Sequence, residues 1–372
     1  MVDRIDVLRG TVMATTAVDT TKSGDVVVGI DTHKYVHVGA VFDTTAGLLS
    51  TISVPADSRG FSQSLSWAES FGHTLAFGIE GTGSYGGALT SFIRRRGYRV
   101  VEVARPDRRM RRLVGKSDTI DAQNAAKAVM AGFATAEPKT ADGTVEMIRQ
   151  LKVAHDTAVK ARATTMVTLK AMLVHAPEAL RAEMAGKTQI MLARHCAALT
   201  TEHLDSPDDS IRITLATLAR RWLTLHHEAI ELNQHIEALV KTTAPQLVQS
   251  YGIGTDTAAE ILIVFGDNPQ RIKSEAALAK LAGISPIPAS SGTTTGKYRI
   301  NHGGHRQRGA AIYRTVIVRM RFHEPTKTYI ARRTAEGKTK RDIIRCLKRY
   351  VIREVYHLVN NPVTSANASW QL

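Results

Sequence analysis

Short apolar runs rich in β-branched residues, separated by turn-forming residues, dominate the first third of the chain. Such runs predict β-strands, because alternate side chains of a strand pack against a core. The runs lie at residues 25–30, 36–42, 48–54, 73–79 and 99–103. Only turn residues separate the first three runs, so we expect an antiparallel meander at the start of the domain.

Three segments with apolar residues at helical spacing lie between and after the later strands, at residues 59–71, 86–96 and 118–131. Ser117 directly precedes the last of these helices and is a suitable N-cap. An antiparallel meander followed by alternating helices and strands is the element order of a layered RNase H-like domain. We therefore predict an α/β catalytic domain at residues 24–136, preceded by a mobile N-terminal extension at residues 1–23.

A heptad pattern marks the middle of the chain and predicts a coiled coil. From Ile211, apolar or small residues recur at alternating spacings of four and three, at Leu215, Leu218, Trp222, Leu225, Ala229, Leu232, Ile236 and Leu239. Residues 144–175 form a second long helical candidate. The two helices can pair within one chain, as an antiparallel hairpin, or across a dimer as a dimerising arm, and the pattern leaves both open. We assign residues 144–242 to this coiled-coil region.

The remainder of the chain is predicted to be mainly helical, as a C-terminal domain at residues 243–357 with a tail at 358–372. Two helices flank the peptide Gly252-Ile253-Gly254, which resembles a helix-hairpin-helix element. The glycine amides and the helix N-terminus of such an element can bind phosphate, although simple helix packing explains the same pattern. Arginine and lysine are dense in the last helices, which favours contact with nucleic acid.

Composition adds a strong positive charge to this picture. The chain has 49 lysines and arginines against 34 acidic residues, a formal net charge of +15. A field of this sign attracts phosphate backbones, and the alternative is a basic enzyme without a nucleic-acid partner. Two cysteines are too few for a disulfide framework, and no apolar run is long enough to span a membrane, so we expect a cytoplasmic protein.

Four carboxylates stand at the ends of predicted elements. Asp31 and Glu80 end the first and fourth predicted strands, while Asp118 and Asp121 are three residues apart on one helix. Converging carboxylates repel one another unless a divalent cation neutralises them, and hard oxygen ligands suit Mg²⁺ or Mn²⁺. We predict a metal site for phosphodiester chemistry; the alternative is separate surface acids, with Asp118 only capping its helix.

A segment rich in serine, threonine and glycine, residues 289–299, has the composition of an active-site loop. A serine hydroxyl there needs a base or metal and nearby cations to attack phosphorus. The alternative is a flexible linker. We take Ser291 as the candidate nucleophile, and we expect nucleic-acid contacts from Gly252, Gly254, Lys297, Arg299, His302, Arg306 and Arg308.

Five motifs, in order, resemble the DEDD-type insertion-sequence transposases that are understood as bridge-RNA-guided recombinases. The motifs are GIDTHK, GIEGTGSYG, KSDTIDAQNAA, SYGIGTDTAAEIL and AGISPIPASSG, and the resemblance covers residues 24–357. It implies a Holliday-junction-resolvase-like N-terminal domain, a coiled coil and a C-terminal transposase domain carrying a nucleophilic serine. It also implies a structured noncoding RNA that pairs with donor and target DNA, a dimer or tetramer, and a bacterial cytoplasmic location at the nucleoid.

The resemblance also implies roles for particular residues. Asp31, Glu80, Asp118 and Asp121 match the metal-binding quartet of the family, and Ser291 matches the nucleophile, with Ser290 beside it. The chain departs from the family pattern after the serine loop. His302 stands at the position of a lysine, and Gly309-Ala310 stand near the position of an arginine pair, so Arg306 and Arg308 are the nearest substitutes.

These observations lead to one main hypothesis and two rivals. The main hypothesis is a site-specific DNA recombinase that excises and inserts a mobile element through a serine-linked DNA intermediate, with Mg²⁺ at the acidic quartet. One rival is a metal-dependent junction-resolving nuclease in which the serine is idle. The other is a non-catalytic nucleic-acid-binding protein with the same fold.

Overall fold

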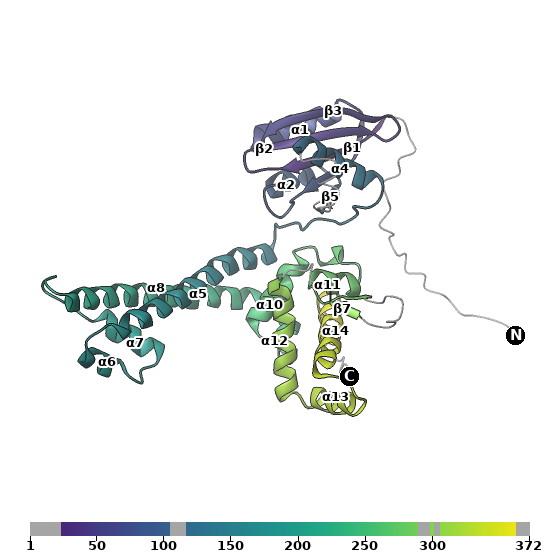
Figure 1. The fold of residues 1–372 in the computed structure, drawn as a ribbon. Coiled ribbons are helices and arrows are strands. Elements are labelled where there is room, and N and C mark those ends of the chain that lie inside the picture. Colours follow the sequence, from purple (N-terminus) through teal and green to yellow (C-terminus); the bar gives the residue numbers. More distant parts are fainter. Residues whose placement is uncertain (1–23, 105–116, 289–297, 301–305, 362–372) are drawn as a thin grey trace. The chain divides into compact units, whose positions relative to one another are not determined.

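The computed structural model describes residues 24–104, 117–288, 298–300 and 306–361 (Figure 1). The chain divides near residue 140 into two compact units. The predicted N-terminal extension, the serine loop with Ser290 and Ser291, and the last residues of the tail lie outside the described residues. No helix within the described ranges is long and apolar enough to cross a membrane.

A five-stranded mixed sheet forms the core of the N-terminal unit. Its strands are β1 Asp25–Thr32, β2 Val36–Asp43, β3 Gly47–Pro55, β4 His73–Glu80 and β5 Val100–Val103. They lie in the order β3-β2-β1-β4-β5; the first three form an antiparallel meander, and β4 and β5 run parallel to β1. This is the RNase H-like arrangement, which confirms the predicted α/β fold.

Helices cover both faces of this sheet. They are α1 Ser58–Glu69, α2 Gly87–Arg95 and α4 Asp118–Met130. Ile30 of β1 and Ile79 of β4 pack toward α1 and α2, whereas the alternate residues Val27 and Ala76 pack toward α4. Because both faces of the central strands are buried, these strands are almost continuously apolar. The predicted strands and helices of this unit are confirmed, with ends shifted by one or two residues.

Helix α4 lies unusually close to the sheet because glycine occupies the contact. A Cβ atom on Gly29 of β1 would lie 2.0 Å from the carbonyl oxygen of Ala122 and 2.3 Å from the backbone nitrogen of Ala126. The helix contributes only small residues at this contact, Ala122, Ala125 and Ala126. The glycine therefore sets the depth of α4, and with it the position of the acidic residues in the first turn of α4.

Two long antiparallel helices open the second unit, α5 Thr144–Val174 and α8 Pro207–Thr243, and they pack along one another (Figure 1). Every seventh residue of the predicted heptad is buried, at Leu215, Trp222, Ala229 and Ile236. The alternate positions, including Leu218 and Leu225, are only half-buried. The heptad therefore pairs two helices of one chain, as the hairpin interpretation proposed.

The far end of the hairpin carries two short helices that the hydrophobic pattern did not predict, α6 Glu178–Met184 and α7 Gln189–Ala197. Leu180, Met184 and Cys196 pack against Leu169 of α5 and Leu215 of α8. Each helix has too few turns for a periodic pattern to stand out from its neighbours. They close the open end of the helix pair with a small apolar core.

The remaining elements form the predicted mainly helical C-terminal region. They are α9 Pro245–Gln249, α10 Thr255–Phe265, the 3₁₀ helix η1 Pro269–Arg271, α11 Glu275–Leu281, β6 Pro286–Pro288, β7 Tyr298–Ile300, α12 Arg306–Phe322, α13 Glu324–Ala335 and α14 Lys340–Asn360. The predicted helix-hairpin-helix shape is confirmed by α9, the glycine turn and α10. Phe265, Val316 and Leu347 share one core with Ile236 of α8, so the long helices are rooted in this region.

Candidate active site

Asp31 and Glu80 lie side by side at the carboxyl ends of two parallel strands. Ile30 pairs with Ile79 in the register of β1 and β4, and each acidic residue follows directly. Because successive side chains alternate between faces, both carboxylates lie on the α4 side of the sheet, opposite the two isoleucines. The Thr32 hydroxyl donates a hydrogen bond of 2.8 Å to the Glu80 carbonyl oxygen and ties the two strand ends together. Both carboxylates belong to buried residues.

The first turn of α4 brings two more carboxylates to the same end of the sheet. Asp118 opens the helix and Asp121 follows one turn later, where the positive end of the helix dipole favours acidic side chains. Asp121 is buried, whereas Asp118 is half-exposed. Ser117 is the N-cap as predicted, and its backbone carbonyl accepts from the Asp121 N–H at 3.0 Å, but its side chain makes no capping hydrogen bond.

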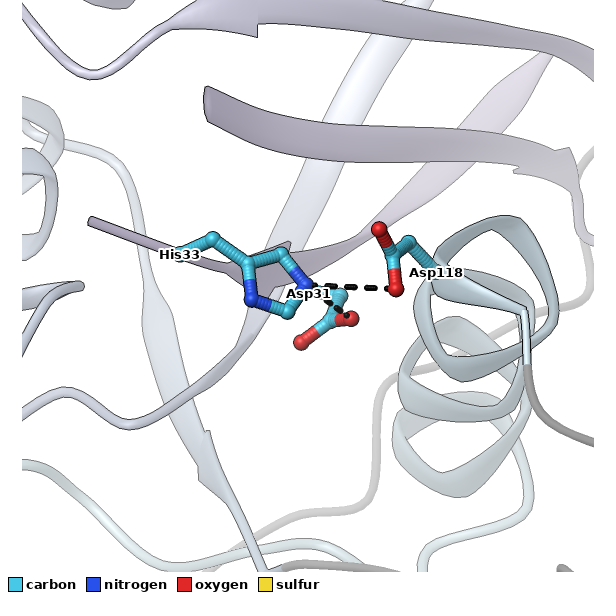
Figure 2. Close-up of side chains that lie close together, drawn as sticks. All are labelled: Asp31, His33 and Asp118. Carbon is cyan, nitrogen blue, oxygen red and sulfur yellow. Dashed lines mark hydrogen bonds and ion pairs between the residues drawn. The ribbon is translucent and has the colours of Figure 1, made fainter. Parts of the chain in front are cut away.

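His33 joins two of these acids and was not predicted as a site residue. Its Nε2 lies 3.1 Å from Oδ2 of Asp31 and 3.3 Å from Oδ1 of Asp118 (Figure 2). The three side chains offer ligand atoms that all lie within 4.8 Å of one another. The sequence offered one signal for His33, its position two residues beyond Asp31 in the turn after β1. Polar residues are too common in turns for that position to single it out.

The electrostatics of Asp31 reflect this crowding. Burial raises the pKa of Asp31 above the ordinary aspartate value, and the neighbouring charges of Asp121 and Asp118 raise it further, while His33 lowers it. All three neighbours therefore act on one carboxylate. A bound cation would reverse the balance, because it favours the charged form of every surrounding acid.

The donor set suits a divalent metal ion. Carboxylate oxygens are the preferred ligands of Mg²⁺ and Mn²⁺, and an imidazole nitrogen is compatible with Mn²⁺ and the later transition metals. Asp31, His33 and Asp118 are close enough to share one ion. Glu80 and Asp121 are placed at the same sheet end by register and by the helix turn. Among the described residues, however, the group of close ligand atoms comprises only Asp31, His33 and Asp118.

The predicted nucleic-acid-binding residues are spread over the second unit. Gly252 has a φ of 79°, and a Cβ there would touch Val318 and Arg319 of α12 at 3.4 Å, while Gly254 is the N-cap of α10. Arg299 lies in β7, and Arg306 and Arg308 lie in the first turn of α12. Lys297 and His302 lie outside the described residues.

Two family models match the chain. The first is described as a transposase and matches residues 28–176; the second is described as a transposase of the IS116/IS110/IS902 family and matches residues 244–331. Together they account for more than half of the chain. The first covers the acidic residues of the N-terminal unit, and the second covers the glycine turn and the serine loop.

Two curated relatives are proteins of insertion elements. A 43.6 kDa protein of insertion element IS110 from Streptomyces coelicolor is 29% identical over 41% of this chain and 38% of its own length. A 42 kDa protein of insertion element IS900 from Mycobacterium paratuberculosis is 25% identical over 51% of this chain and 50% of its own length. The chain thus spans half or less of the length of each relative.

Proposed function

We propose that this chain, which belongs to the IS110 family of DEDD transposases, cuts and rejoins DNA during the excision and insertion of a mobile element. The observation that carries the proposal is the convergence of carboxylates from β1, β4 and α4 at one end of the sheet. Such a site can hold two divalent cations at a phosphodiester, which would supply Lewis acidity to the attacking and leaving oxygens.

Asp31, Glu80, Asp118 and Asp121 would hold the metal, most simply Mg²⁺, with Mn²⁺ as a substitute. Asp31 is the central ligand, since it lies near both other groups of the cluster, and burial and the neighbouring carboxylates raise its pKa. His33 bridges Asp31 and Asp118 through its Nε2 atom. Thr32 fixes the backbone of Glu80, so the strand ends do not separate.

Ser291 is proposed as the nucleophile of the joining chemistry. Its Oγ attacks a DNA phosphorus, and the bond from phosphorus to the leaving DNA oxygen breaks. The leaving oxygen takes up the proton that the serine hydroxyl releases. The resulting phosphoserine ester keeps the energy of the broken phosphodiester, so a new DNA end can displace the serine without ATP. Arg299, Arg306 and Arg308 are proposed to stabilise the negative charge that develops on the phosphoryl oxygens.

A guide RNA is proposed to select the DNA sequence. The support is the net charge of +15 and the family resemblance, which together favour binding of structured RNA through its backbone and helical shape. The protein is further proposed to act as a dimer or tetramer, with the acidic quartet of one protomer serving the serine loop of another. Sequencing the RNA that co-purifies with the protein tests the RNA proposal directly.

A metal-dependent junction-resolving nuclease is the second candidate. It is favoured by one observation: described residues of the N-terminal unit alone supply the converging carboxylates. In that case water attacks the phosphorus and no protein–DNA bond forms. A non-catalytic nucleic-acid-binding protein is the remaining alternative.

Trapping a denaturation-resistant protein–DNA adduct separates these candidates. The wild-type protein, with its co-purified RNA, Mg²⁺ and DNA carrying an element end, should form the adduct, and Ser291→Ala should abolish it while DNA and RNA binding remain. Ser290→Ala is the matched control and should behave as wild type. Metal-dependent cleavage without an adduct supports the nuclease, and binding without cleavage supports the non-catalytic protein.

A further inference from the structure

An exposed aromatic ring stands at the glycine turn between α9 and α10. Tyr251, directly before Gly252, is 47% exposed, whereas Ile253, directly after Gly252, is buried in the core. The centroid of its ring lies 4.8 Å from that of His323, the residue between α12 and α13, with the ring planes 32° apart. The turn therefore presents a tilted pair of rings, with Tyr251 exposed and His323 half-buried.

The backbone of this turn is held in place by charged side chains. Arg319 Nε donates a hydrogen bond of 2.8 Å to the Tyr251 carbonyl oxygen. The guanidinium of Arg319 also binds Glu354 through two bonds of 2.6 and 2.8 Å, and it donates to the Ser250 hydroxyl at 3.0 Å. Arg319 and Glu354 are almost buried, so the Tyr251 backbone is fixed before any partner arrives. A group fixed in this way loses little conformational entropy on binding.

The surroundings of the ring pair favour a polyanion that carries flat neutral groups. The α12 sequence contains five arginines and no acidic residue. Among them, Arg321 is exposed, whereas Arg319 is paired with Glu354. The exposed Arg314 is paired with Asp256 at 3.0 Å. Burial, and then the charge of Arg319, lower the pKa of His323 below the ordinary histidine value, against the opposing charges of Glu354 and Glu324, which favours the neutral ring. Two neutral rings offer stacking surface rather than a phosphate contact.

We infer that Tyr251 and His323 form a stacking platform for an unpaired base of single-stranded DNA. Aromatic side chains beside a basic surface are the usual means of holding single strands, because every base has a π face. The inference rests on the proposed function, since strand exchange on DNA exposes unpaired bases. It goes further by naming the residues and the unpaired state that they recognise.

The test measures binding of the full-length protein to single-stranded DNA that carries the fluorescent base 2-aminopurine, with metal removed by EDTA. Stacking on the platform should quench the fluorescence. Tyr251→Ala should remove the quench and weaken binding by about fivefold to a hundredfold, the range of one base–aromatic stack. Tyr251→Phe should keep both, because the stacking face is retained.

Tyr313→Ala is the matched control, since Tyr313 is also an exposed tyrosine and lies beside Lys348 at 4.8 Å. It should bind and quench as wild type, and circular dichroism should show all variants folded. Three results would overturn the inference. Tyr251→Ala could bind single-stranded DNA as tightly as wild type, or Tyr313→Ala could weaken that binding equally. Tyr251→Ala could also weaken binding only to RNA or to duplex DNA of the same sequence. Failure of this inference can be told apart from failure of the proposed function, because a protein that does not cleave DNA can still bind it and quench the 2-aminopurine fluorescence.

Discussion

The acidic end of the N-terminal sheet and the glycine turn of the C-terminal region use electrostatics in opposite ways. At the sheet end, like charges are brought together, and burial and repulsion raise the pKa of Asp31. At the turn, opposite charges meet, and Arg319 with Glu354 fixes the backbone of Tyr251. Apolar packing, together with His33 between Asp31 and Asp118, therefore holds the first region against the repulsion of its carboxylates, whereas an ion pair fixes the turn of the second region. An arrangement maintained against its own electrostatics indicates a binding function.

Packing at Gly29 should be the most sensitive point of the first region. Gly29→Ala places a Cβ atom against the backbone of α4, at 2.0 Å from a carbonyl oxygen, so the helix must move. We expect the free energy of unfolding of the N-terminal unit to fall by about 3 kcal/mol, the upper end of the range for overpacking, because the contact is with backbone atoms. Hydrogen exchange of β1 and β4 measures this loss. Gly83→Ala is the control, because nothing lies within 4 Å of its Cβ position, and it should change little.

Divalent cations should relieve the repulsion at the sheet end. Free Mg²⁺ at a hundredfold excess over its dissociation constant should stabilise the N-terminal unit by about 2.7 kcal/mol. A thermal-shift titration measures the effect, and it should vanish in Asp31→Asn but persist in Glu69→Gln, which alters an exposed acid of α1 bonded to Tyr98. An equal Mg²⁺ response in Asp31→Asn would contradict the assignment of Asp31 as a ligand.

The ion pair at the glycine turn predicts that the turn loses stability when one of the two charges is removed. Arg319→Met leaves Glu354 buried without its partner and frees the Tyr251 carbonyl, so we expect a loss of about 2 kcal/mol in local stability. Faster hydrogen exchange of the Ile253 N–H, which bonds to Ser250 at 3.1 Å, would report it. Arg321→Met is the control, since its side chain is exposed against Phe322, and it should shift stability by less than about 0.5 kcal/mol.

The smallest effect concerns Asp31 without metal. The folded protein holds the Asp31 proton more tightly than the unfolded chain, so stability falls as the pH rises from the ordinary aspartate value through the raised pKa. Asp31→Asn removes this loss and should stabilise the protein at pH 7 in EDTA, by about 1 kcal/mol or less. Urea unfolding with and without EDTA measures it. A destabilised Asp31→Asn in EDTA would indicate a structural role for the carboxylate.

The sequence predicted the parts of the site that depend on local pattern. Apolar β-branched runs located β1 and β4, and their ends located Asp31 and Glu80. His33 was missed, because a polar residue in a turn shows its role only when a helix from a distant segment approaches it. The heptad of α8 predicted a coiled coil but not its partner helix. The apolar stripe is the same whether the partner belongs to the same chain or to another protomer. The pairing of Arg319 with Glu354 joins two basic helices whose charge pattern alone suggested contact with nucleic acid.

The rate of DNA strand cleavage by Asp31→Asn, measured beside wild type at equal DNA occupancy in Mg²⁺, tests the central claim most directly. The claim is that the converged carboxylates hold the metal that drives the chemistry. Asp31→Asn should lose cleavage by at least about a thousandfold, as expected when a metal ligand is removed, while DNA and RNA binding stay within about twofold because the basic surface is unchanged. Cleavage by Asp31→Asn at the wild-type rate would contradict the account.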